Sequence, residues 1–142
     1  MEEALFRGKR IDNDEWITGM SWIFSPPIKK ALIISAMGLV GEDDDISRYC
    51  ESDEVHPETI SQFTGGVDKT GKKIFSGDII KTYCPGLPVY THIINFYPEH
   101  MAFMARCIEM NTVNYLCNIK QSAMLIVGNI YDNPELLGGD VN

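Results

Sequence analysis

Short runs of apolar residues, separated by clusters of turn-forming residues, recur along most of the chain. The runs are rich in β-branched and aromatic residues, which suit the pleated surface of a sheet. Many short strands with closely spaced turns are typical of a small β-barrel or sandwich, so the fold is expected to be mainly β. Strands are predicted over residues 6–11, 15–24, 30–35, 59–64, 72–75, 79–83, 89–97, 101–108, 113–119 and 125–131.

The first two predicted strands form an N-terminal β-hairpin around the turn cluster Asp12–Asp14. Pro26 and Pro27 end the second strand, because proline cannot donate to a strand ladder. Trp16 and Trp22 lie six residues apart, so a regular strand places both on one face. That face is either core or an oligomer interface, since aromatic residues are enriched at the centres of interfaces.

A second hairpin is predicted at the start of the C-terminal region. Asp68 and Gly71 fit the first and fourth positions of a type I turn, and a left-handed Gly71 gives a bulged hairpin into Lys72–Phe75. At Gly77 and Asp78, glycine permits a tight turn and the carboxylate can accept hydrogen bonds from nearby backbone amides. We interpret Asp78 as structural, and a direct ligand role is the less favoured alternative.

The last predicted element is a short C-terminal helix. Asp132 or Asn133 is expected to cap it, Pro134 suits its first position, and Gly138 stops it. The predicted fold is therefore mainly β, with an N-terminal hairpin extension, a barrel-sized C-terminal body and this short helix.

Acidic residues are concentrated in one segment. The net charge is −8, and residues 42–54 carry seven carboxylates against Arg48, which is −6 of that total. We expect a solvated acidic loop here, dividing an N-terminal hairpin region (residues 1–56) from a barrel region (residues 57–142). Overall acidity argues against loose, charge-driven nucleic-acid binding. An alternative is that the acidic run imitates a phosphate backbone and occupies a host DNA-binding protein.

The chain has no features of a membrane or secreted protein. Its longest mostly apolar run, Ala31–Val40, is far shorter than the ~20 residues of a transmembrane helix. It begins Met1-Glu2-Glu3, with acid where a signal peptide carries basic charge. The four cysteines lack paired spacing, so neither disulfides nor a metal site is expected. We therefore expect a cytoplasmic protein.

Two groups of side chains are candidates for chemistry. Four lysines on or beside the second hairpin are interleaved with aromatic residues, a pattern that can hold a nucleic-acid strand but more often covers a packed core. His56, His92 and His100 match no metal-ligand spacing. No phosphate-binding loop or nucleophile elbow is present, so no enzyme activity, catalytic residue or cofactor is predicted. The lysines are Lys69, Lys72, Lys73 and Lys81.

Three segments together resemble the YopX family of phage and prophage proteins. They are Phe6–Trp16 (FRGKRIDNDEW), Gln62–Ile80 (QFTGGVDKTGKKIFSGDII) and Val127–Leu137 (VGNIYDNPELL). The resemblance implies a phage or prophage origin, the cytoplasm of the infected host as location, and an SH3-like barrel in the C-terminal half. It implies no enzymatic activity and supplies no catalytic residues. The chain departs from the family pattern at Asp14, Gly66 and Thr70.

The leading hypothesis for function is a non-enzymatic phage accessory protein that binds another protein or itself. It depends on the β-rich fold, whose edge strands need covering, and on the lack of a catalytic constellation. The expected partner is a second copy, or else a host or phage protein. Nucleic-acid binding through the lysine-bearing hairpin, residues 69–81, is the alternative from another class.

Overall fold

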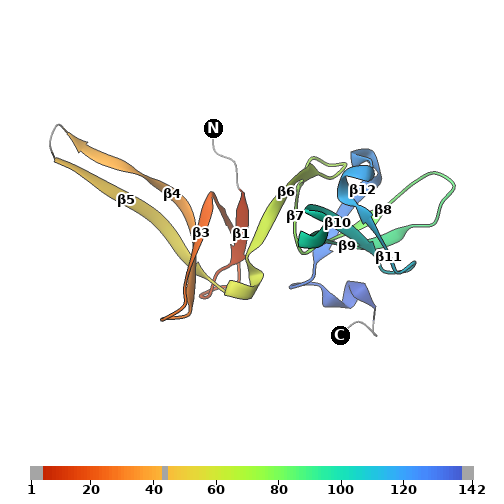
Figure 1. The fold of residues 1–142 in the computed structure, drawn as a ribbon, viewed down its shortest axis with the longest axis horizontal. Coiled ribbons are helices and arrows are strands. Elements are labelled where there is room, and N and C mark those ends of the chain that lie inside the picture. The colour runs from red at the N-terminus through yellow and green to blue at the C-terminus, as the bar shows by residue number, and fades with distance from the viewer. Residues whose placement is uncertain (1–4, 43–44, 139–142) are drawn as a thin grey trace. The chain divides into compact units, whose positions relative to one another are not determined.

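The computed structural model describes residues 5–42 and 45–138, which fold into antiparallel strands and short 3-10 turns (Figure 1). The chain forms two compact units, residues 1–62 and 63–142. This division lies six residues beyond the boundary expected from the sequence. Residues following the expected boundary stay with the first unit because Thr59 Oγ1 accepts the Lys9 N–H (2.9 Å) and because Ser61 and Gln62 pair with β1.

The first unit contains a small hairpin and a three-stranded sheet. β1 pairs with β2, which confirms the predicted N-terminal hairpin, and β1 also pairs with the start of β6. β3, β4 and β5 are joined in that order, and β4 and β5 run together as a long hairpin (Figure 1). The elements are β1 (Phe6–Lys9), β2 (Trp16–Gly19), β3 (Ser21–Ser25), β4 (Lys30–Glu42), β5 (Asp45–Val55) and the 3-10 turn η1 (Pro57–Thr59).

The acidic stretch 42–54 is not the solvated loop that its composition suggests. All of it from residue 45 onward belongs to β5, which pairs with β4; residues 43–44 lie outside the described part of the chain. The ladder pairs the backbone groups on one side of β5, and near its base Lys30 Nζ lies 3.9 Å from Glu54 Oε1. Pairing with a β-branched, apolar neighbouring strand thus outweighs the low strand propensity of acidic residues.

The second strand of the predicted N-terminal hairpin is in fact two strands in different sheets. β2 ends at Gly19, which lies so close to β4 that a Cβ would collide with the Ile34 carbonyl oxygen. Only glycine permits this approach, and the chain enters the other sheet directly after it. Trp16 and Trp22 therefore lie on β2 and β3, and the prediction that they share the face of one strand is wrong.

The described part of the first unit has one buried apolar cluster. Ala31 and Ile33 alternate along β4 and, with Val55 of β5, are completely buried. Phe6, Ile17 and Ile60 pack against this group and stay partly exposed. β-Strand periodicity therefore supplies one apolar face, and the hairpin and η1 cover it.

The second unit contains a hairpin, β6–β7, and a five-stranded antiparallel sheet of order β11-β10-β9-β8-β12. The predicted turn is confirmed: the Gly71 N–H donates to Asp68 O (3.0 Å), and Gly71 has φ +89°. The strands are β6 (Ser61–Val67), β7 (Lys73–Phe75), β8 (Asp78–Thr82), β9 (Tyr90–Tyr97), β10 (Ala102–Cys107), β11 (Thr112–Tyr115) and β12 (Met124–Asn129). The 3-10 turns are η2 (Pro98–His100), η3 (Leu116–Asn118), η4 (Gln121–Ala123) and η5 (Pro134–Leu137).

Both faces of the five-stranded sheet are covered. Ile80 and Ile94 belong to one buried cluster, whereas Ile79 and Ile93 belong to another. β11 and β12 are nevertheless the two edge strands and do not pair with each other, so within the described residues no sheet closes into a barrel and the SH3-like barrel is not confirmed. Closure depends on strand tilt and stagger, which the alternation of residues along a strand does not encode.

The C-terminal helix is reduced to the four-residue 3-10 turn η5. Pro134 begins it and Gly138 follows it as predicted, but the Asn133 side chain does not cap it. Asn133 Oδ1 instead accepts the Asn129 N–H at 3.2 Å, which ties the turn to β12. In the part of the chain that is described, no helix has the length and apolarity needed to cross a bilayer.

Candidate functional site

β3 is an edge strand of the first unit that exposes large apolar side chains. Among the strands described, it pairs with β4 alone, and its sequence, Ser21–Ser25, contains no charged residue and no proline. Trp22 is 42% exposed, Ile23 52% and Phe24 40%. Natural edge strands usually carry a lysine, a proline or a bulge that prevents pairing with another chain. Within its five residues, β3 has no lysine and no proline.

The exposed aromatic residues of β3 border a shallow hollow. Trp22 and Phe24 are two residues apart and line it together with Pro57 and Ile60 of the same unit. The volume of the hollow is about 340 Å³. Because side chains alternate along a strand, Ile23 lies on the opposite face. Both faces of β3 are therefore apolar at the surface.

The two tryptophans predicted at an interface have different surroundings. The guanidinium carbon of Arg7 lies 4.6 Å from the centre of the Trp16 ring, so Trp16 is engaged within its own hairpin. Trp22 lies on β3 and is exposed. Sequence reasoning missed Ile23 and Phe24, although the uncharged run before Pro26 was the available signal.

The four lysines considered for nucleic-acid binding all lie in the second unit. The Lys69 Nζ atom is 4.9 Å from the centre of the Tyr83 ring, and the Lys73 Nζ atom is 5.2 Å from that of Phe63. Bases stack on free ring faces, and here Lys69 covers one face of Tyr83 and Lys73 one face of Phe63. Lys69 and Lys72 are exposed, whereas Lys73 and Lys81 are half-buried. Binding of nucleic acid by this group stays a prediction.

Asp68 is buried, and its carboxylate joins the β6–β7 turn to β12. Oδ1 accepts the Thr70 N–H (2.9 Å), the Thr70 hydroxyl (2.6 Å) and the Lys72 N–H (3.1 Å), while Oδ2 accepts the Ile126 N–H (3.0 Å). Burial by itself raises the pKa of Asp68, but these hydrogen bonds outweigh it and lower the pKa to about 2. Asp78 Oδ2 likewise accepts the Phe75 N–H at 2.8 Å. Both carboxylates thus hold turns, as the sequence predicted for Asp78.

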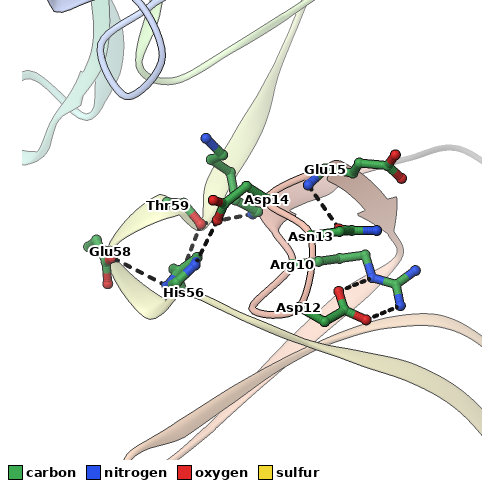
Figure 2. A network of polar contacts seen from close by, with 9 residues as sticks. Arg10, Asp12, Asn13, Asp14, Glu15, His56, Glu58 and Thr59 are labelled. Atoms are coloured by element: carbon green, nitrogen blue, oxygen red, sulfur yellow. Dashed lines mark hydrogen bonds and ion pairs between the residues drawn. The ribbon is translucent and has the colours of Figure 1, made fainter.

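A polar network connects the tip of the first hairpin to η1 (Figure 2). Asp14 has a left-handed backbone (φ 57°), and its Oδ1 lies 3.0 Å from His56 Nε2. His56 Nδ1 lies 3.9 Å from a Glu58 carboxylate oxygen, and Arg10 binds Asp12 through two nitrogens at 3.0 and 2.8 Å. Exposed ion pairs such as these contribute little to stability, so the role that the contacts support is to orient the turn.

The three histidines each have local partners. His56 contacts Asp14, His92 Nε2 lies 3.1 Å from Thr82 Oγ1, and the ring of His100 stacks on that of Tyr97. No cluster of three His, Cys, Asp or Glu side chains that could hold a metal ion occurs among the residues described. The four cysteines are free.

The sheets and turns define an all-antiparallel β protein of two compact units, with an exposed apolar edge on the first. The chain belongs to the YopX family: the family model described as "YopX protein" matches residues 5–138. A crystal structure of protein EF1440 from Enterococcus faecalis has a similar fold, with a TM-score of 0.66 and 24% sequence identity over 96% of this chain and 99% of that chain. A comparison with curated proteins gave no match.

Proposed function

We propose that this chain is a non-enzymatic accessory protein of phage or prophage origin that self-assembles, with edge strand β3 of one copy pairing with β3 of a second copy. The observation that carries the proposal is the uncharged, exposed edge of Trp22, Ile23 and Phe24. The two buried carboxylates, Asp68 and Asp78, accept backbone hydrogen bonds and serve the fold, which supports a binding role over a catalytic one.

The chemistry of the edge favours a second copy as the occupant. Antiparallel pairing about a two-fold axis places the same strand on both sides of the interface. With Ile23 at the axis, Trp22 of one copy faces Phe24 of the other, and cross-strand aromatic pairs stabilise antiparallel sheets. The chain as a whole carries −8, so a contact between copies is most favourable where no carboxylate is buried, and β3 meets that condition.

The test is the molar mass in solution, measured by light scattering over about 1–100 µM, the range of ordinary protein association. The wild-type chain is expected to be a dimer. Phe24→Lys and Ile23→Lys introduce the charge that natural edges use, on opposite faces of β3. Each change occurs twice in the dimer, so the dissociation constant of the dimer should rise about a hundredfold.

Met110→Lys is the matched control, because Met110 is 57% exposed and lies in the turn between β10 and β11 of the second unit. This variant should remain dimeric, and circular dichroism should show that all variants are folded. A strictly monomeric wild-type chain contradicts self-assembly. A dimer that survives both β3 variants places the contact elsewhere and also contradicts the proposal.

A further inference from the structure

A cavity of about 720 Å³ lies within the second unit, lined by the sheet on one side and by the segment joining β11 to β12 on the other. Binding sites for small molecules are usually of roughly 300–1,000 Å³. This cavity is therefore large enough for a molecule of about the size of a nucleotide or a heteroaromatic acid. It is independent of the β3 edge, which belongs to the first unit.

A buried imidazole contributes to the sheet side of the cavity. His92 of β9 is 9% exposed and pairs with Ile80, so its side chain shares the face that carries the buried cluster of Ile80 and Ile94. Its Nε2 lies 3.1 Å from the hydroxyl oxygen of Thr82. Its Nδ1 is buried, and none of the described residues gives it a hydrogen-bond partner. Buried polar atoms without partners are rare in folded proteins and often mark a functional position.

The imidazole of His92 is enclosed at Nδ1 and lies beside the Thr82 hydroxyl at Nε2. Burial lowers the pKa of His92, while the charge of Glu109 acts in the opposite direction. The Glu109 carboxylate itself accepts the Thr91 N–H at 2.7 Å. A neutral imidazole has one N–H and one lone pair. The Thr82 hydroxyl can accept from the N–H or donate to the lone pair at Nε2. With Nδ1 enclosed, a ligand in the cavity packs against the part of the His92 ring that stays exposed.

The walls of the cavity are held in place by one backbone and one side-chain hydrogen bond. The Tyr83 N–H donates to the Ala123 carbonyl (2.8 Å), which joins the loop after β8 to η4. The Asn118 amide nitrogen lies 3.4 Å from Asn114 Oδ1 across the opposite wall. A site whose walls are already fixed loses less entropy when a ligand binds.

The lining combines aromatic rings with positive charge. Tyr83 and Tyr90 supply rings, Lys120 supplies a cation, and none of the described residues that line the cavity is acidic. Lys69 places a second ammonium 4.9 Å from the centre of the Tyr83 ring. In a chain with a net charge of −8, a cavity with this lining selects a flat ligand that carries a negative charge.

We propose that this cavity binds a small planar heteroaromatic anion, with its ring beside Tyr83, Tyr90 and the imidazole of His92 and its anionic group on Lys120. The anion can be a phosphate or a carboxylate, since an ammonium binds either as a point charge. Adenosine monophosphate and indole-3-acetate represent these two sources. Adenosine and indole-3-acetamide are their uncharged counterparts.

The experiment is a titration of the full chain with each of the four probes, followed by the ¹⁵N signals of the histidine rings. The chain has three histidines, so His56, bonded to Asp14, and His100, stacked on Tyr97, are internal controls. At least one anionic probe should shift the His92 signals and leave those of His56 and His100 unchanged. It should bind about tenfold more tightly than its uncharged counterpart, because a hydrogen bond to a charged group is stronger than a neutral one.

Two variants and one control test the assignment of residues. Lys120→Met keeps the aliphatic stem and should remove the tenfold preference for the anion, whereas Lys72→Met, an exposed lysine outside the cavity, should retain it. Ser122→Trp fills the cavity from its exposed side and should abolish binding of both kinds of probe. The inference is overturned if no probe binds at about 1 mM, the weak limit of specific affinity. Binding without a His92 shift, or equally affected by the two lysine variants, also overturns it.

Discussion

The side chain of Asp68 joins two segments of the second unit that are 58 residues apart in sequence. Its two carboxylate oxygens accept from the turn on one side and from Ile126 of β12 on the other. Thr70 is one of the departures from the family pattern. Its hydroxyl donates a hydrogen bond to Asp68 Oδ1, the oxygen that also accepts from the turn amides. A single buried carboxylate therefore fixes both the hairpin turn and the position of a distant strand.

Asp68→Asn should destabilise the protein by about 1–3 kcal/mol, measured as the free energy of unfolding in urea at pH 7. The substitution turns one acceptor oxygen into an NH₂ donor, and both oxygens of Asp68 already face donors. A buried donor left without an acceptor costs free energy of this order. Glu99→Gln, at an exposed position in η2, should leave the unfolding free energy unchanged.

The pH dependence provides a second readout of the same change. The pKa of Asp68 is about 2 in the folded chain against an ordinary value of 3.8, so its contribution to stability is complete above about pH 4. That contribution is lost as the pH falls towards 2. The difference in stability between the wild-type chain and Asp68→Asn should therefore shrink over this range. A difference that stays constant from pH 7 to pH 2 would contradict the role assigned to the ionised carboxylate.

Among the elements, the strands of the five-stranded sheet differ in how firmly they are held. β8 pairs with β9 on one side and β12 on the other. Ile79 and Ile80, which lie on its two faces, are completely buried. Of the described strands, β11 pairs with β10 alone, and all four of its residues are exposed. Local opening requires little free energy where backbone hydrogen bonds face solvent and few apolar contacts are lost.

Amide hydrogen exchange should reflect this order. The amides of β8 should exchange only on global unfolding, whereas those of β11 should exchange by local fraying. Because global opening of a domain requires roughly 5 kcal/mol or more, β8 should be protected about a thousandfold more than β11. Exchange measured by NMR at pH 7 checks this, and equal protection of the two strands would show that β11 is covered in solution.

At the scale of the whole molecule, charge and core are unevenly divided between the two units. Thirteen carboxylates against six basic side chains give residues 1–62 a charge of −7, and seven against six give residues 63–142 a charge of −1. Among the residues that the structure describes, one buried cluster lies in the first unit, around Ile33, and two lie in the second, around Ile80 and Ile79. The smaller core and the greater self-repulsion both weaken the first unit.

The first unit should therefore unfold at a lower urea concentration than the second. Both tryptophans, Trp16 and Trp22, belong to the first unit, so their fluorescence follows it alone, while far-ultraviolet circular dichroism follows both units. Raising NaCl from about 20 mM to 300 mM shortens the Debye length severalfold and should move the fluorescence transition to higher urea. The second unit should respond little. Transitions that coincide at every salt concentration would mean that the two units unfold as one.

The sequence by itself determined what local chemistry specifies. β-Branched and aromatic runs identified most strands, and the Asp68–Gly71 and Gly77–Asp78 turns follow from residues that act within four positions of one another. The three segments that resemble the YopX family led to a family assignment that the match over residues 5–138 confirms.

Tertiary structure decided the features that depend on distant neighbours. The acidic stretch forms a strand because β4 lies beside it, and one long strand becomes two at Gly19 because Ile34 leaves no room for a side chain. The open sheet, the exposed edge of β3 and the buried Nδ1 of His92 likewise depend on which elements pack together. Backbone pairing and burial act between residues far apart in the sequence, and alternation within a single strand carries no record of them.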